Sequence, residues 1–237
     1  MELAMKVMVL GATGATGHLV VKQLLDAECD VVALVRNTEV LAEHPRLNQI
    51  NNTALSLESQ HLQRLISECD AVISCLGHNM TLQGVYGAPR MLVTNSLQRV
   101  ISLTSKQRER PLKLVLMSSA GVRNLVLQER VEQSEKWLNL LLRWILPPHR
   151  DNEKAAKLLN RNSTSHKSLE WAIVRPDTLI DQSQVSDYQW HQSPTRSALF
   201  NAGETSRINV ANALCRLVLD DDLWQQWHGQ MPVIYNA

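Results

Sequence analysis

The chain has 237 residues, of which 44% are hydrophobic and 20% are charged, so its composition is that of an ordinary globular protein. A chain of this length buries enough surface to fold without disulfides or metal ions. Its formal net charge of +1 argues against a protein dedicated to nucleic acid or to a membrane surface.

The cysteines and the apolar stretches bear on the compartment. The cysteines form no CxxC pair and no zinc spacing, so we interpret Cys29, Cys69, Cys75 and Cys215 as small buried side chains in a reducing compartment. The segment before Gly11 is too short for a signal peptide, and the apolar stretch 137–146 is far shorter than the roughly 20 residues that span a bilayer. We expect a cytoplasmic monomer or homodimer with no membrane span, which takes a small-molecule substrate and no nucleic acid.

Strand-like apolar runs alternate with amphipathic helical segments along the chain. Consecutive Val, Leu and Ile residues are typical of parallel strands covered on both faces, and they predict strands at 6–10, 31–35, 48–51, 71–75, 112–117, 171–174 and 232–235. Apolar residues at helical spacing predict helices around 20–25, 62–66, 93–101 and 211–218. This alternation predicts an α/β fold of the Rossmann type, with a doubly wound and mainly parallel sheet in a single domain over residues 1–237.

Residues 123–150 form a long insertion between the fifth and sixth predicted strands. Trp137, Leu138, Leu141, Leu142, Ile145 and Leu146 give it an apolar face, and Pro147 and Pro148 end it. Such a segment is either a helix packed on the core or a flap or oligomer contact on the substrate side. We expect the substrate side to be built from about 123–150 and 177–207.

A glycine-rich turn joins the first strand to the first helix. Gly11 permits a tight turn, Gly14 lets a pyrophosphate approach the backbone, and Gly17 lets the helix pack close to the sheet. Free N–H groups at the start of the helix then face the phosphates. This context predicts that a dinucleotide is bound by Gly11, Thr13, Gly14, Ala15, Thr16 and Gly17.

The end of the second strand selects the form of the cofactor. NAD-binding proteins usually carry an acidic residue about 20 residues beyond the glycines, where it holds the ribose 2′-hydroxyl. Arg36 stands there instead, and a guanidinium can bind a 2′-phosphate through two hydrogen bonds and stack on adenine. The sequence therefore favours NADP (NADPH) over NAD, although Arg36 can also be an ordinary solvated arginine.

With these motifs, the chain resembles the atypical short-chain dehydrogenase/reductase group, in particular its NAD(P)H-binding branch of NmrA-like proteins and flavin or biliverdin-IXβ reductases. The resemblance covers most of the chain and is carried by 11–17, 33–37, 69–77, 116–121 and 171–176. It implies that the fourth strand ends at the nicotinamide, and that adenine is contacted through an apolar or amide group because 51–56 contain no acid. It adds to the cofactor site Leu55, Cys75, Leu76, Gly77, Ser118 and Pro176.

The catalytic motif of that superfamily is incomplete here. None of Tyr86, Tyr188 and Tyr235 begins a Tyr-x-x-x-Lys motif. Lys154 matches the family lysine, which places Arg150 at the position of the tyrosine, and an arginine cannot donate a proton at neutral pH. Ser119 matches the family serine, so Ser119 and Lys154 are the candidate catalytic residues, each with a purely structural alternative.

An intact cofactor site without the tyrosine favours an NADPH-dependent reductase that transfers hydride to a conjugated acceptor, such as a flavin, a quinone or a tetrapyrrole. The alternative is a non-catalytic NADP(H)-binding regulatory or assembly protein of the NmrA-like type. We consider His149 and Asp151 as a possible proton relay. Further candidate pocket residues are His78, Tyr188, Trp190, His191 and Phe200.

Overall fold

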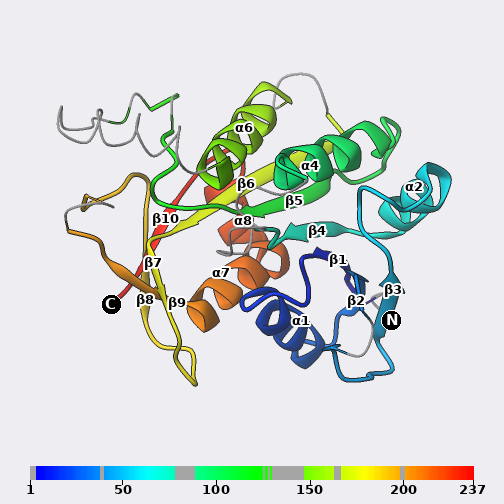
Figure 1. Cartoon of the computed structure of the whole chain (residues 1–237), viewed down its shortest axis with the longest axis horizontal. Coiled ribbons are helices and arrows are strands. Elements are labelled where there is room, and N and C mark those ends of the chain that lie inside the picture. Colours follow the sequence, from blue (N-terminus) through cyan, green and yellow to red (C-terminus); the bar gives the residue numbers. More distant parts are fainter. Residues whose placement is uncertain are drawn as a thin grey trace.

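An eight-stranded sheet with helices on both faces organises the chain (Figure 1). The computed structural model describes residues 4–37, 40–77, 89–124, 126–127, 129, 147–162, 167–197 and 201–237. The strand order is β3-β2-β1-β4-β5-β6-β10-β8, and neighbours are parallel except for β10 and β8. These strands are β1 (Lys6–Leu10), β2 (Asp30–Val35), β3 (Leu47–Asn51), β4 (Ala71–Ser74), β5 (Leu112–Met117), β6 (Leu169–Pro176), β8 (Tyr188–His191) and β10 (Val233–Asn236).

The helices divide between the two faces of the sheet. One face packs on α1 (Gly17–Asp26), α7 (Arg207–Leu219) and α8 (Asp221–Trp227), and the other packs on α2 (Ser59–Glu68), α4 (Leu92–Leu103) and α6 (Pro147–Asn162). A separate pair of short strands, β7 (Thr178–Ile180) and β9 (Glu204–Ser206), forms a second parallel sheet. The arrangement is the three-layered sandwich that a doubly wound sheet requires.

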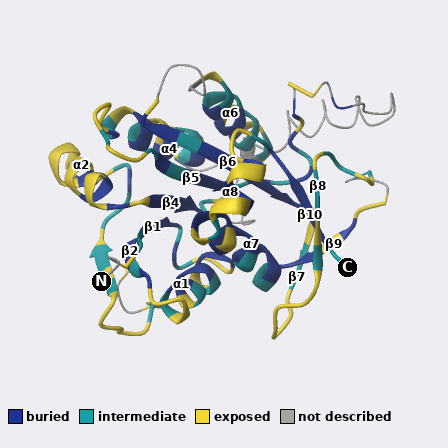
Figure 2. Ribbon diagram, turned by 180° about the vertical axis from the view of Figure 1, so that it is seen from behind, coloured by how far each residue is buried: buried dark blue, intermediate teal, exposed yellow. Residues whose placement is uncertain are grey.

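Alternation along each strand supplies both cores. In β1, Val7 and Val9 enter the core with α1 and α7, whereas Met8 and Leu10 enter the core with α2 and α4. All four are almost fully buried, because successive strand residues point to opposite faces and helices cover both. Figure 2 shows this burial as a dark central sheet between helices whose outer faces are exposed.

The predicted Rossmann-type fold is confirmed, and each predicted strand has a counterpart within two residues at either end. The sequence prediction missed β7, β8 and β9, because these short strands lack the run of three consecutive apolar residues that marks β4 and β10, which are also short. Residues 130–146 of the insertion, with its predicted apolar face, lie outside the described residues. The helix that follows begins at Pro147, where a missing N–H group costs nothing.

Candidate functional site

The carboxyl ends of the parallel strands meet at one edge of the sheet. The chain proceeds from β1 to β2 on one side, while β4 lies on the other, so the strand order reverses between β1 and β4. Ligands of doubly wound folds bind at such a reversal. From β3 to β6 the segments at this edge are 52–55, Arg36, 11–17, 75–77, 118–121 and 176–177, so every predicted cofactor residue lies at the end of a strand or in the loop after it.

Gly11 and Gly17 bring the turn closer to its neighbours than a side chain allows. Gly11 has a φ of +77°, and a Cβ there would lie 2.8 Å from the backbone carbonyl carbon of Cys75 in the loop after β4. A Cβ at Gly17 would lie 2.0 Å from the carbonyl oxygen of Gly11. Glycine is therefore required at both positions, and the turn is wedged between the first helix and the fourth strand.

The turn also leaves backbone donors exposed. The N–H of Gly14 donates to the Gly11 carbonyl and that of His18 to the Gly14 carbonyl, both at 3.0 Å. Within the described residues, the N–H groups of Ala15 and Thr16 find no backbone acceptor, and the Thr16 side chain does not cap α1. Gly14 and Ala15 are exposed, so a phosphate can reach these amides and the positive end of the helix dipole.

On the β2 and β3 side, Arg36 is exposed at the end of β2 and Leu55 is half-buried in the loop after β3. That loop is held by Arg99 of α4, a residue that the sequence analysis did not single out. The Arg99 guanidinium donates to the carbonyl oxygens of Ala54 at 3.0 Å and Leu55 at 2.5 Å, and to that of Leu57. Arg36 and Leu55 thus lie at the ends of neighbouring strands, and Arg99 holds the loop that carries Leu55 in place.

On the β4 and β5 side, Cys75 and Leu76 are half-buried and Gly77 is exposed. Burial raises the pKa of the Cys75 thiol to about 12, so this thiol stays protonated near neutral pH and is a poor nucleophile. Ser118 is buried, and its Oγ has no hydrogen-bond partner among the described residues. Pro176 is buried, and its carbonyl oxygen accepts the N–H of Ala120 at 2.8 Å, which joins the ends of β5 and β6.

The first turns of α6 reach the end of β5 beside Gly121. A Cβ at Gly121 would lie 3.7 Å from Ser119 Oγ and 3.6 Å from His149 Cε1, so these two side chains border the same space. His149 Nε2 lies 3.6 Å from Glu153 Oε1. Arg150 and Lys154, the pair singled out from the sequence, are exposed on the helix. The structure therefore brings His149 and Glu153, rather than Arg150 and Lys154, to the inner side of this helix.

Asp151 does not extend toward His149. Its side chain is fully buried and accepts hydrogen bonds from Val93 N–H at 2.8 Å and Thr94 N–H at 3.0 Å, at the start of α4. The Thr94 hydroxyl adds a bond at 2.6 Å. Asp151 thus caps α4 from the neighbouring helix, and a relay through Asp151 and His149 is not what this geometry forms.

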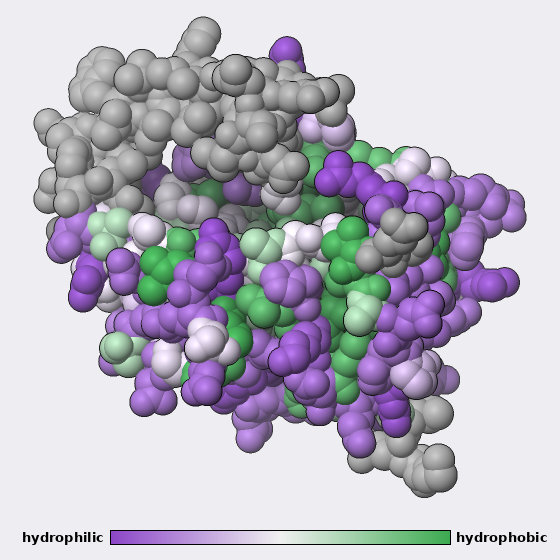
Figure 3. All heavy atoms as spheres, turned by 60° about the horizontal axis from the view of Figure 1, so that its bottom comes forward, coloured by the Kyte–Doolittle hydropathy of each residue, from purple (hydrophilic) through white to green (hydrophobic). Residues whose placement is uncertain are grey.

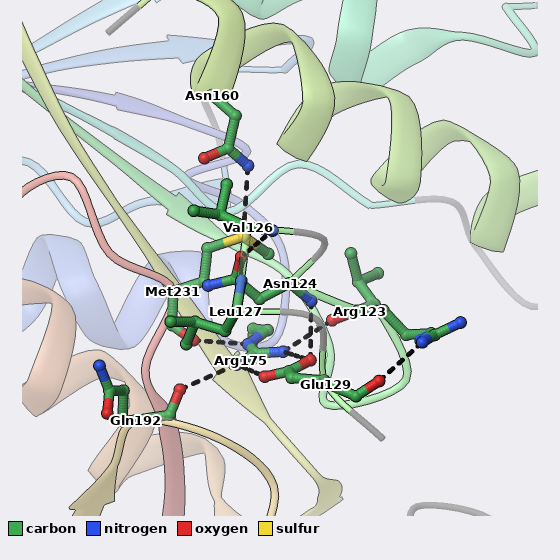
Figure 4. A network of polar contacts seen from close by, with 10 residues as sticks. Arg123, Asn124, Val126, Leu127, Glu129, Asn160, Arg175, Gln192 and Met231 are labelled. Atoms are coloured by element: carbon green, nitrogen blue, oxygen red, sulfur yellow. Dashed lines mark hydrogen bonds and ion pairs between the residues drawn. The ribbon is translucent and has the colours of Figure 1, made fainter. Parts of the chain in front are cut away.

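Arg175 joins several segments that lie near the end of β6 (Figure 4). Its guanidinium donates to Glu129 Oε1 at 2.7 Å and Oε2 at 3.0 Å, and its side chain is fully buried. It also donates to the carbonyl oxygens of Val122 at 2.9 Å, Met231 at 2.6 Å and Gln192 at 3.3 Å. One buried cation thereby ties the start of the insertion to the 177–207 segment and to the chain before β10.

The candidate pocket residues after β6 divide between the two faces of the sheet. Tyr188 and Trp190 pack against the core beside α7 and α8, where Trp190 stacks on Trp227 at 5.7 Å. His191 points to the other face and lies 5.6 Å from the Tyr235 ring. His78 and Phe200 lie outside the described residues.

Figure 3, which brings the lower side of Figure 1 forward, shows a hollow in the surface with hydrophobic and nearly neutral residues gathered beside it.

Among the described residues, no group of His, Cys, Asp and Glu has the arrangement of a metal site. None of the described helices combines the length and the hydropathy needed to cross a bilayer.

Solved structures share the fold at low sequence identity. A candidate NAD-dependent epimerase/dehydratase from Bacillus halodurans superposes with a TM-score of 0.71 and 20% identity, over 99% of this chain and 95% of that one. A candidate NADH-flavin reductase from Streptococcus pneumoniae TIGR4 gives 0.69 and 17%, over 99% and 100%. A wide-type short-chain dehydrogenase/reductase from Veillonella parvula DSM 2008, in complex with NADP, gives 0.64 and 16%, over 99% and 95%. At these identities the likeness shows the fold alone.

Sequence comparison supplies the family. No curated protein sequence matches the chain. A profile described as NAD(P)H-binding matches residues 11–221, which is most of the chain and begins at the first glycine of the turn. This match confirms the resemblance drawn from the motifs. The chain belongs to this NAD(P)H-binding family.

Proposed function

We propose that the protein is an NADPH-dependent reductase of the atypical short-chain dehydrogenase type, which transfers hydride to a conjugated acceptor such as a flavin, a quinone or a tetrapyrrole. The observation that carries the proposal is the turn at 11–17, wedged by Gly11 against the loop after β4 while its amides stay exposed. When bound, the nicotinamide supplies the hydride. The protein's part is to hold the pyrophosphate at this turn and the nicotinamide beside 75–77, Ser118 and Pro176.

Arg36 supports NADPH rather than NADH as the cofactor. It is exposed at the end of β2, next to the strand whose loop carries Leu55. A guanidinium at this position can pair with a 2′-phosphate, which NADH lacks.

We further propose that the chain is one domain whose substrate side is formed by about 123–150 and 177–207. The described parts of both segments are joined by Arg175, through Glu129 on one side and Gln192 on the other. Ser119, whose carbonyl oxygen accepts the N–H of Val122 at 2.9 Å, is the proposed contact for a substrate oxygen.

Two measurements test the proposal. Calorimetry of wild type and Arg36→Glu with NADPH and NADH should show a loss of about 10- to 100-fold that is confined to NADPH, since a pair of charge-assisted hydrogen bonds contributes about 1.5–3 kcal/mol. Equal losses for both nucleotides would contradict the choice of NADPH. NADPH oxidation is then followed with FMN and with quinones, and tight binding without turnover on any acceptor would contradict the reductase.

The second candidate is a non-catalytic NADP(H)-binding regulatory or assembly protein. Its support is the exposure of Val126 and Leu127, which are 72% and 42% exposed at the start of the insertion, because such residues suit a partner surface. This candidate predicts a protein partner that co-purifies with one redox form of the cofactor and is lost on Val126→Ser.

A further inference from the structure

The backbone on both sides of Ser119 is bonded to the end of β6. The N–H of Ser118 donates to the Val174 carbonyl oxygen at 2.8 Å. The N–H of Ala120 donates to the Pro176 carbonyl oxygen, also at 2.8 Å. Ser119 lies between these two bonds, so β6 fixes the point at which the chain enters the loop after β5.

The Ser119 side chain is oriented within a turn. The Val122 N–H donates to the Ser119 carbonyl oxygen at 2.9 Å, which closes a turn over residues 119–122. The Gly121 N–H donates to Ser119 Oγ at 3.3 Å. A hydroxyl that accepts from the backbone in this way keeps its own proton for donation, which suits the proposed contact with a substrate oxygen.

The buried ion pair of Arg175 and Glu129 holds the end of this turn (Figure 4). Arg175 Nη1 donates to the Val122 carbonyl oxygen at 2.9 Å and to Glu129 Oε2 at 3.0 Å, while Nη2 donates to Glu129 Oε1 at 2.7 Å. Glu129 Oε2 also accepts the N–H of Asn124 at 2.7 Å. The pair is therefore bonded to the chain at residues 122 and 124, directly where it leaves the turn.

Burial leaves this arrangement few alternatives. The Arg175 and Glu129 side chains are 0% and 6% exposed, and Val122 is buried as well. A buried guanidinium and a buried carboxylate are costly without partners, and the planar fork of an arginine fixes the directions of its hydrogen bonds. The ion pair thus fixes the direction of the Val122 carbonyl group, whose residue also closes the turn on Ser119.

We propose that Arg175 and Glu129 are positioning residues for the acceptor: by fixing the end of the 119–122 turn, they place the Ser119 hydroxyl at the acceptor oxygen. This inference rests on the proposed function and adds to it the pair that controls binding and turnover of the acceptor. The side-chain partners of Arg175 lie at residues 122, 129, 192 and 231, which are not part of the proposed cofactor site. The affinity for NADPH should therefore not depend on the pair.

The test removes the pair without leaving a charge buried. The double variant Arg175→Met/Glu129→Met replaces both partners by apolar side chains, a change that often leaves a fold about as stable as before. The control is Lys6→Met/Glu68→Met, which removes an ion pair of the same length, 2.7 Å, that is 31% and 45% exposed. Glu129→Gln, which keeps one side-chain oxygen for Arg175, takes the place of the double variant if the latter does not fold.

Steady-state kinetics with NADPH, and with FMN or 9,10-phenanthrenequinone as acceptor, tests the link to Ser119. Misplacing a contact by about 1 Å can cost about 100-fold, so the double Met variant should lose about 10- to 100-fold in kcat/KM for the acceptor. Its Kd for NADPH should stay within about two-fold of wild type. Ser119→Ala should cost about 100-fold in wild type but at most a few-fold more in the double variant, because there the contact is already lost.

Hydrogen exchange followed by mass spectrometry examines the turn without any acceptor. The N–H groups of Ala120, Val122 and Asn124 are all bonded in the structure. Peptides that cover residues 118–124 should exchange about 10-fold faster in the double Met variant, because the end of the turn is released, whereas peptides from α1 should exchange as in wild type. The control variant should match wild type in both regions and in turnover.

Each result supports or overturns the inference. Unchanged exchange over residues 118–124, or a full effect of Ser119→Ala in the double variant, overturns it while the reductase stands. A loss of NADPH affinity as large as the loss of kcat/KM also overturns it, because the pair would then support the fold as a whole. If the wild type binds NADPH and reduces neither acceptor, the reductase fails, and the positioning role in its reaction fails with it.

Discussion

The two ends of the carboxyl edge are built in different ways. The end near β1, which we propose to hold the dinucleotide, uses a seven-residue segment, 11–17. Its effect comes from the backbone: side chains are absent at Gly11 and Gly17, and the amides of Ala15 and Thr16 find no backbone acceptor among the described residues. The end near β5 and β6, which we propose as the substrate side, uses side chains from distant parts of the chain. Glu129 meets Arg175 across 46 positions, and Ser119 and His149 both lie near Gly121.

The contrast teaches which changes each end tolerates. At the end near β1, backbone atoms are packed closely around Gly11 and Gly17, so a Cβ added at either position destabilises the turn. At the end near β5 and β6, the fold depends on a buried ion pair, so the loss of one partner destabilises the protein. A Cβ added at Gly121 meets no close contact there. Four predictions probe this difference, from the largest expected effect to the smallest.

Arg175→Met should lower the free energy of unfolding by about 3–5 kcal/mol, because it leaves the Glu129 carboxylate buried without its cation. Denaturant unfolding of wild type and variant measures the loss. Lys6→Met is the matched control: Lys6 and Glu68 are also 2.7 Å apart but 31% and 45% exposed, and such pairs contribute about 0–1 kcal/mol. Similar losses for the two variants would show that burial of the pair does not matter.

Gly11→Ala should cost about 2–4 kcal/mol and abolish tight NADPH binding, since it combines a left-handed φ with a backbone contact at 2.8 Å. Gly229 offers a control, because it has a φ of +71° but nothing within 4 Å of an added Cβ. Gly229→Ala should cost about 1 kcal/mol from backbone strain and leave the affinity for NADPH unchanged. Calorimetric titration with NADPH measures the affinity of both variants. An equal loss of affinity in the two would contradict the prediction.

Arg99→Met should raise the Kd for NADPH several-fold and destabilise the protein by about 2 kcal/mol, because it releases the carbonyl groups of the 54–57 loop. The reduced affinity should come from the adenine end, so binding of 2′,5′-ADP should weaken as much as binding of NADPH. Arg64→Met, whose side chain is 75% exposed, should change neither quantity. An unchanged affinity for 2′,5′-ADP would remove Arg99 from the binding site.

The cysteines should react slowly in the native protein. Burial raises the pKa of Cys69 and of Cys75 to about 12 and that of Cys29 and Cys215 above the ordinary value. At pH 8 a thiol with a pKa near 12 is ionised to about one part in ten thousand, so alkylation at Cys69 and Cys75 should accelerate only on unfolding or as the pH rises toward 12. Mass spectrometry after iodoacetamide treatment at pH 7 to 10 checks this, and rapid native labelling of Cys75 would show that the end of β4 is open.

Much of the fold could be read from the sequence because its determinants are local and periodic. Runs such as Val7–Val9 and Val31–Val35 alternate with helical patterns. The glycine-rich turn predicts a strand directly before it and a helix directly after it. The short strands β7 to β9 were missed because they contain no run of consecutive apolar residues like those of β4 and β10. In the site, the residues of the turn were found by spacing, whereas Arg99 and Glu129 were not, since each is bonded to a partner more than 40 residues away.

The sequence by itself determined the class of protein: the turn at 11–17, the alternation of strands and helices, and an arginine where NAD-binding proteins carry an acid. Those features depend on residues that are close together in the sequence, so the sequence pattern alone predicts them. Only the tertiary structure decided which face of α6 meets the end of β5, because a one-residue change of register turns a helix by about 100° and exchanges buried for exposed side chains. It likewise decided that Asp151 caps a helix and that Arg175 binds Glu129, since pairing of buried charge is settled by where the elements pack.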